Sequence, residues 1–131
     1  MTSRSLLIAL SLVFAATSAH AGDVYVVASP SLNLAADDIR DVFLGEKQFA
    51  GSVKLVPVDN GSLQADFLAR ALKVDGARYA SVWSKKGFRD GLTPPPVRNS
   101  DLDVLAAIKA NPGTVGYVSK PTADVKVLQK F

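Results

Sequence analysis

The chain has 131 residues, of which 48% are hydrophobic, with 15 Lys and Arg against 12 Asp and Glu. This length suits one compact domain, and the apolar fraction is high enough for a packed core. The sequence contains no cysteine, which excludes disulfides, thiol nucleophiles and cysteine-based metal sites. A formal net charge of +3 is too small to indicate nucleic-acid binding.

The first 21 residues have the layout of a secretory signal peptide. Arg4 precedes the apolar run Leu6–Ala16, and Ala19-His20-Ala21 supplies an A-x-A cleavage site. A membrane-spanning helix needs about 20 apolar residues, so an uncleaved anchor is the weaker interpretation. Cleavage after Ala21 would leave residues 22–131 as a periplasmic protein, with no cysteine at the boundary to carry a lipid.

The predicted mature chain lacks histidine as well as cysteine, because His20 is the one histidine of the sequence. It therefore offers no Ser-His-Asp triad, Cys-His dyad or His-ligated metal site. The patterns GxxxxGK[ST] and GxGxxG, which cradle phosphates in nucleotide-binding proteins, are also absent. We expect a protein that is not an enzyme and that has no metal or cofactor.

The predicted elements alternate between strands and helices. Val24–Ala28 is a continuous apolar run, typical of a strand buried on both faces. The turn Ser29-Pro30-Ser31 follows, and a helix then begins near Asp37-Asp38 and ends at Gly45. The apolar face of this helix is formed by Ile39, Val42 and Phe43.

The next strand is predicted at Val53–Val58, and the polar segment Asp59-Asn60-Gly61-Ser62 ends it. Ser62 is in position to cap a helix from Leu63 to about Leu72. A third helix is predicted over Gly76–Lys86. The inward residues of these two helices are Phe67, Leu68, Ala71 and Leu72, and then Tyr79, Val82 and Trp83.

Gly87–Asn99, which contains Pro94-Pro95-Pro96, is predicted as a loop. Ser100 with Asp103 resembles a capping box, which opens a helix to about Asn111. The last two strands are predicted at Val115–Val118 and Val125–Leu128. Strands separated by helices indicate one α/β domain with a largely parallel sheet.

Three features could bind a ligand, and each has a structural alternative. The N–H groups, hydroxyl and glycine of Asp59-Asn60-Gly61-Ser62 would form an anion site, or an ordinary capped turn. The basic residues Lys85, Lys86 and Arg89 would collect anions, or would mark a solvated helix end. Trp83 and Phe88 would stack on a ligand, but their place on the apolar stripe favours core packing.

Five segments follow one another in a characteristic order: VYVVASPSLNL (Val24–Leu34), ADDIRDVFLG (Ala36–Gly45), VPVDNGSLQADF (Val56–Phe67), VWSKKGFRDGLTPPP (Val82–Pro96) and NPGTVGYVS (Asn111–Ser119). In this order they resemble the phosphate-binding periplasmic proteins of ABC transporters, and more closely the short, stand-alone relatives of these proteins. The resemblance implies a type II periplasmic-binding-protein fold, of which residues 22–131 supply about one lobe. The glycines of the last segment are then expected to permit close backbone packing.

The resemblance also implies an oxyanion site. The family binds phosphate with helix N-termini, hydroxyls, an arginine and an aspartate, and its ligand loop resembles Arg-x-Asp-Gly-Ser-Gly-Thr. Asp59 matches the aspartate, whereas Pro57 stands in the place of the arginine and Asn60-Gly61-Ser62 shifts the Gly-Ser pair by one residue. Without the arginine, a charge-assisted contact worth about 1.5–3 kcal/mol is missing, and we expect weaker phosphate binding than in the long proteins.

Two functions from different classes follow. The first is a solute-binding protein that takes part in uptake through a membrane transporter and binds phosphate or a related oxyanion. Its expected ligand-binding residues are Asp59, Asn60, Gly61, Ser62 and Gln64, with Ser29 and Ser31 at the edge of the sheet. The second is an interaction module that has lost the ligand and presents its former interlobe face to a membrane sensor, a transporter or a second copy of itself.

Overall fold

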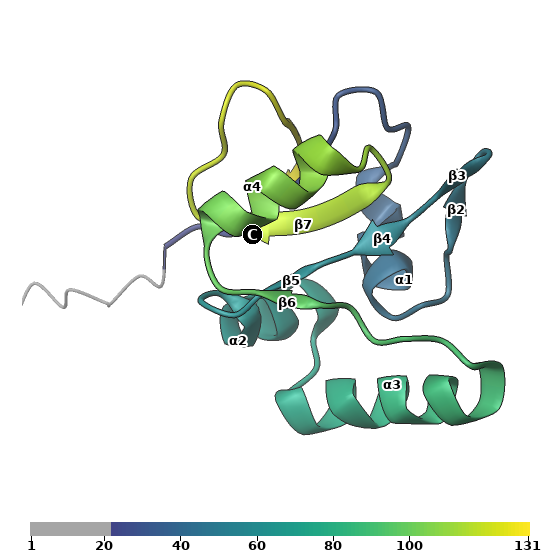
Figure 1. Cartoon of the computed structure of the whole chain (residues 1–131). Coiled ribbons are helices and arrows are strands. Elements are labelled where there is room, and N and C mark those ends of the chain that lie inside the picture. Colours follow the sequence, from purple (N-terminus) through teal and green to yellow (C-terminus); the bar gives the residue numbers. More distant parts are fainter. Residues whose placement is uncertain (1–21) are drawn as a thin grey trace, which may run out of the picture.

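A computed structural model of the protein describes residues 22–131, and the predicted signal peptide lies outside this range. A four-stranded sheet forms the centre of the molecule, in the spatial order β4-β7-β1-β8 (Figure 1). Its strands are β1 (Tyr25–Ala28), β4 (Val56–Pro57), β7 (Thr114–Val118) and β8 (Lys126–Lys130). Helices flank the sheet, which confirms the predicted α/β class.

The pairing of these strands corrects one expectation. β1 pairs antiparallel with both β7 and β8, whereas β4 and β7 are parallel, so the sheet is mixed but not largely parallel. The alternation of strands and helices indicated parallel crossovers between successive strands, but β1 takes both of its neighbours from the C-terminal end of the chain. Val24 and Phe131 extend this pairing, because each donates its backbone N–H to the carbonyl oxygen of the other.

The remaining elements surround this sheet. The helices are η1 (Ala36–Asp38), α1 (Ile39–Phe43), α2 (Gln64–Phe67), the π-helical turn η2 (Leu68–Leu72), α3 (Gly76–Asp90) and α4 (Asp101–Ala110). Two small sheets pair β2 (Phe49–Ala50) with β3 (Val53–Lys54), and β5 (Asp59–Asn60) with β6 (Val97–Arg98).

The helices lie close to their predicted positions, and their ends differ. α3 runs four residues beyond Lys86, because Gly87 continues the helix and Gly91, with a φ of 69°, ends it. The cap of α4 is confirmed, since Ser100 accepts the N–H of Asp103. The predicted strand Val53–Val58 is divided into β3 and β4, because β3 pairs with β2 whereas β4 pairs with β7.

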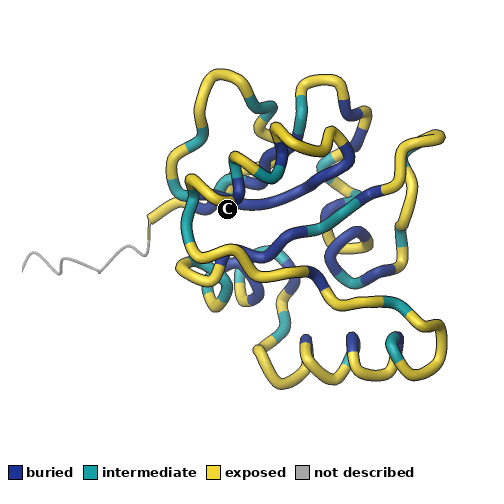
Figure 2. The backbone as a smooth tube through the Cα atoms, viewed as in Figure 1, coloured by how far each residue is buried: buried dark blue, intermediate teal, exposed yellow. Residues whose placement is uncertain are grey.

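The sheet separates two apolar layers. On one face, α4 packs over β7 and β1 through a small cluster of Val27, Val104, Ile108 and Val118. On the other face lies the main core, to which α1, α2, η2 and α3 contribute. Figure 2 shows the inner strands β1 and β7 as almost entirely buried, whereas the edge strands β4 and β8 are half-buried or exposed and α3 is buried only at its inward turns.

Three aromatic rings fill the centre of the main core. Phe67 stacks on Tyr117 with ring centroids 3.9 Å apart, and Phe43 meets Phe67 edge-on at 4.7 Å. All three side chains are fully buried. Such ring pairs contribute about 0.5–1.5 kcal/mol each beyond the burial of their area. The stack joins α1, α2 and β7.

Long side chains with polar tips attach α3 to the rest of the molecule. Tyr79 donates its hydroxyl to Asp59 at 2.8 Å, and the indole N–H of Trp83 donates to the carbonyl oxygen of Phe43 at 3.0 Å. Lys86 lies one helical turn after Trp83, and its ammonium group forms an ion pair with Glu46 at 2.8 Å. These three residues share the inward face of α3, so the helix is held along its length by hydrogen bonds as well as by apolar contact.

Two glycines of β7 and its preceding turn allow close approach of the backbone. A Cβ at Gly116 would lie 2.5 Å from Cγ1 of Val104, and a Cβ at Gly113 would overlap the carbonyl oxygen of Lys54. Real Cβ atoms do not approach other atoms so closely. The expected packing role of these glycines is therefore confirmed.

Candidate functional site

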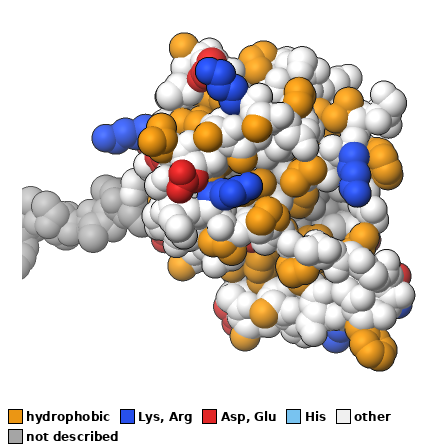
Figure 3. All heavy atoms as spheres, viewed as in Figure 1, with side chains coloured by type: hydrophobic (Ala, Val, Ile, Leu, Met, Phe, Trp, Pro, Cys, Tyr) orange, Lys and Arg blue, Asp and Glu red, His pale blue; other side chains and the backbone are white. Residues whose placement is uncertain are grey.

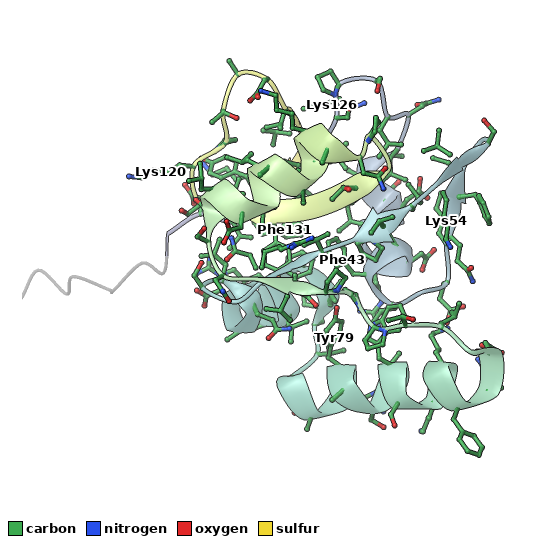
Figure 4. The ribbon with its side chains drawn as sticks, in the orientation of Figure 1. Phe43, Lys54, Tyr79, Lys120, Lys126 and Phe131 are labelled. Carbon is green, nitrogen blue, oxygen red and sulfur yellow. The ribbon has the colours of Figure 1, made fainter. Side chains whose placement is uncertain are left out.

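The polar segment after β4 begins with a carboxylate that is enclosed by tyrosines. Asp59 is 1% exposed, and its two oxygens accept hydrogen bonds from the hydroxyls of Tyr79 and Tyr117, each at 2.8 Å. Figure 4 shows Tyr79 on α3, directed toward the central strands. Asp59 therefore connects α3 to β7 through its hydrogen bonds. This buried position does not support its expected role as a direct ligand of phosphate.

Burial is the main influence on the charge state of this group. It raises the pKa of Asp59, and hydrogen bonds from Tyr79, Tyr117 and Gln64 oppose the increase. Burial and the neighbouring charge of Asp59 also raise the pKa of both tyrosines, so they remain hydrogen-bond donors. Gln64, which was expected to contact a ligand, contributes its side chain to this buried cluster.

Asn60 organises the turn that follows. Its side chain is fully buried, and its amide N–H groups donate to Asp101 at 2.9 Å and to the carbonyl oxygen of Tyr117 at 3.1 Å. Its Oδ1 accepts both the N–H of Ser62, at 3.1 Å, and the Ser62 hydroxyl, at 2.6 Å. The prediction that Ser62 caps α2 is wrong, because the Ser62 hydroxyl points back to Asn60 and the cap position is Leu63.

Asp101, at the first position of α4, supports this turn from the side of β7. It accepts hydrogen bonds from Asn60, from the N–H and hydroxyl of Ser119, and from the N–H of Lys120. Partial burial opposes its ionisation, but the hydrogen bonds from Ser119, Asn60 and Lys120 outweigh burial and lower the pKa of Asp101. Asp101 was not singled out from the sequence except as part of a predicted helix start.

The exposed portion of the segment is small. Gly61 and Ser62 are exposed, whereas Gln64 is half-buried. Gly61 donates its N–H to the carbonyl oxygen of Arg98 at 2.7 Å, which fixes the turn against β6. Any solute that binds here would meet Gly61 and Ser62 rather than Asp59 or Asn60.

Ser29 and Ser31 lie away from this turn. They hydrogen-bond to one another at 2.9 Å after the C-terminal end of β1, where Ala28 pairs with Val115 near the start of β7. Asn60, by contrast, reaches the carbonyl oxygen of Tyr117 near the end of β7. Because β1 and β7 are antiparallel, the two groups of predicted ligand residues lie at opposite ends of the strand, and one small ligand cannot contact both.

The aromatic and basic candidates on α3 are also separated by the structure. Trp83 is buried, as expected, but Phe88 is 98% exposed, so the prediction that it packs in the core is wrong. Phe88 lies beyond the predicted end of the helix and falls on its outer face. Lys86 is buried beside Glu46, which leaves Lys85 and Arg89 as the exposed cations of the predicted cluster.

Residues 22–131 contain neither a metal-binding cluster of His, Cys, Asp or Glu side chains nor a helix that could span a membrane. No group of three or more His, Cys, Asp or Glu side chains in this part of the chain is arranged to hold a metal ion. None of the helices in the same range is long and apolar enough to cross a bilayer.

Comparison with solved structures identifies the architecture. The fold matches a Clostridium perfringens protein, described as a phosphate ABC transporter substrate-binding protein with bound phosphate, with a TM-score of 0.51 and 13% sequence identity. The match covers 82% of this chain and 45% of that protein. The fold is that of a single lobe of such a structure, which we call a PstS-like lobe after the phosphate transporter substrate-binding protein PstS. This PstS-like lobe thus spans less than half the length of that structure.

Two further structures resemble the PstS-like lobe. An ABC-type phosphate transport receptor from Vibrio cholerae has a TM-score of 0.49 and 15% identity, over 82% of this chain and 46% of that one. PstS from Borrelia burgdorferi has a TM-score of 0.48 and 16% identity, over 74% and 41%. No family model matches the chain, and the sequences of curated proteins give no match either.

Proposed function

We propose that this PstS-like lobe is an exported solute-binding protein that binds phosphate or a related oxyanion without covalent chemistry. The observation that carries the proposal is the Gly61-Ser62 turn, where two donors of one exposed residue converge on a single oxygen. The N–H and hydroxyl of Ser62 both point to Oδ1 of Asn60. Convergent N–H and O–H donors are what a dehydrated oxyanion requires.

In this proposal the Ser62 donors exchange Oδ1 of Asn60 for an oxygen of the bound anion. Asn60 remains fixed by Asp101 and Tyr117 when the Ser62 hydroxyl rotates toward the anion, whereas the backbone N–H of Ser62 follows only if its peptide plane turns. The exchange gives up existing hydrogen bonds, and each replacement therefore contributes little net free energy. We accordingly expect weak, millimolar-class affinity in the isolated lobe. The fold of a phosphate-bound protein supports the choice of ligand class.

Thermal unfolding of the protein, expressed from its full sequence and stripped of phosphate by unfolding and refolding, tests the proposal. We expect phosphate to raise the unfolding temperature more than sulfate or chloride at matched ionic strength. A ligand at 100 times its dissociation constant adds about 2.7 kcal/mol to the free energy of unfolding. Ser62→Ala should remove the phosphate-specific part of the shift, whereas Ser81→Ala, an exposed serine on α3, should retain it.

Equal shifts with all three salts would contradict the proposal, because ionic strength alone would then explain them. Loss of the phosphate-specific shift in both serine variants would remove Ser62 as the site. By analogy with the transport proteins that share the fold, we also propose that the lobe delivers its solute to a membrane transporter.

A second candidate function is an interaction module, and one observation favours it. Phe88 is almost completely exposed on the outer face of α3, between the exposed cations Lys85 and Arg89. Figure 3 shows an apolar side chain projecting from the C-terminal part of this helix. Aromatic residues and arginine are enriched at protein–protein interfaces, and both are exposed together here.

A further inference from the structure

A cavity of about 390 Å³ lies beside β4, apart from the Gly61-Ser62 turn. The loop between α3 and β6 forms one wall, and residues 47–48 and 54–57, at the base of the β2–β3 hairpin, form another. Its most informative lining residues are Lys47, Lys54, Pro57, Trp83, Thr93 and Pro95. The volume falls within the range of roughly 300–1,000 Å³ that is typical of small-molecule sites.

Proline explains why a cavity forms at this edge of the sheet. Pro57 of β4 faces the segment Pro94-Pro95-Pro96, and none of these residues has a backbone N–H. The two segments cannot form a ladder of hydrogen bonds here. The two segments meet beyond Pro57, where Asp59 donates its N–H to the carbonyl oxygen of Pro96, whereas Leu55 on the other side of Pro57 donates to Gln48, which belongs to the segment before β2. At Pro57 itself the cavity separates β4 from the three prolines.

The walls of the cavity combine apolar surface with positive charge. Trp83 is held in one orientation by its hydrogen bond to Phe43, and the prolines add further apolar surface. Lys47 and Lys54 are the charged lining residues, and no carboxylate lines the cavity. Lys47 lies 4.0 Å from Asp38, whereas Lys54 forms no ion pair within residues 22–131. Figure 4 shows Lys54 on the β2–β3 hairpin, far from Lys120.

We propose that this cavity binds a small organic acid that has one carboxylate and a compact apolar body about the size of a benzene ring. The carboxylate would lie near Lys54 and Lys47, and the apolar body would contact Trp83 and the prolines. Inorganic phosphate fits poorly, because all its oxygens need hydrogen-bond donors and most of the wall supplies none. The inference goes beyond the proposed function, since it concerns another site and another class of ligand.

The one tryptophan of the sequence reports directly on this cavity. We would titrate the protein, expressed from its full sequence, with benzoate and follow the NMR signal of the Trp83 indole N–H. We expect a saturable change with benzoate and about tenfold weaker binding of benzyl alcohol, which has the ring without the charge. Phosphate should not compete, and Ser62→Ala should bind benzoate as the wild type does. The two proposals can therefore fail separately.

A matched pair of lysine variants locates the site. Lys54→Gln should weaken benzoate binding about three- to fivefold at low salt, the size of an exposed ion pair, and Lys120→Gln should have no effect. Thr93→Phe, an exposed substitution that fills the cavity, should abolish binding of both benzoate and benzyl alcohol. The proposal is overturned if benzoate gives no saturable change, if benzyl alcohol binds equally well, or if the two lysine variants behave alike.

Discussion

Asp59 matches a ligand-binding motif in the sequence, but its side chain is buried and does not reach solvent. Asp59 follows β4, at the position where the phosphate-binding proteins that the sequence resembles have a ligand-binding aspartate. Both of its oxygens nevertheless accept hydrogen bonds from tyrosine hydroxyls of α3 and β7. Burial raises its pKa, so the folded chain binds this proton more tightly than the unfolded chain does. Its contribution to stability is therefore fully present below the unfolded pKa and is lost as pH rises through the raised, folded value.

Asp59→Asn should remove this pH dependence. We expect the free energy of unfolding of the wild type, relative to the variant, to increase as pH falls from about 7 to about 4. Urea unfolding at several pH values measures the difference. Asp101 has the opposite sign, because its lowered pKa gives stability that is lost at low pH, but it is present in both proteins and cancels.

The matched control is Asp37→Asn, which removes an exposed carboxyl group from η1. It leaves the enclosed carboxylate in place, so it should keep the pH dependence of the wild type. If Asp59→Asn and the wild type instead changed in parallel with pH, the proton of Asp59 would not be linked to folding.

At the scale of elements, the contact between α4 and β7 depends on the missing side chain of Gly116. The helix lies so close to the strand that Val104 occupies the space of a Cβ. Helix α4 in turn supplies Asp101, which supports the turn at Asn60. The position of the candidate site thus depends on this helix lying close to the sheet.

Gly116→Ala should reduce the free energy of unfolding by about 1–3 kcal/mol, the usual cost of inserting a methyl group into a packed interior. Urea unfolding measures this cost. Gly76→Ala, at a position with open space around its Cβ, should be neutral or slightly stabilising. In a Val104→Ala background, Gly116→Ala should cost less, because the clashing methyl is gone; an unchanged cost would show that the contact is not responsible.

At the scale of the whole molecule, an interaction through α3 would appear as self-association. If Phe88 is a contact residue, the wild type should associate at high concentration without added ligand, and Phe88→Ser should be monomeric. Sedimentation equilibrium measures this difference. Leu102→Ser is the matched control, since Leu102 is an apolar residue of α4 that is 76% exposed. A wild type that remains monomeric at every concentration would exclude this form of the second function.

How much of the fold and of the candidate site the sequence predicts depends on how far apart in the chain the interacting residues lie. Helices were found because their apolar residues repeat within a few positions, as at Ile39, Val42 and Phe43. Strand partners were not found, since β1 pairs with residues about ninety or more positions along the chain. The same applies to the site. The polar segment was located, but the burial of Asp59 depends on Tyr79 and Tyr117, which no local pattern connects to it.

The position of β1 between β7 and β8 also determines when the molecule can fold. The first strand has no partner in the central sheet until the last two strands exist, and Val24 completes its pairing with Phe131 itself. Contacts so distant in sequence make folding slow, because a long loop must close before they form. A chain emerging from the ribosome thus cannot complete its central sheet before residues 114–131 have been made, and its sheet stays unformed for longer than one built from local contacts.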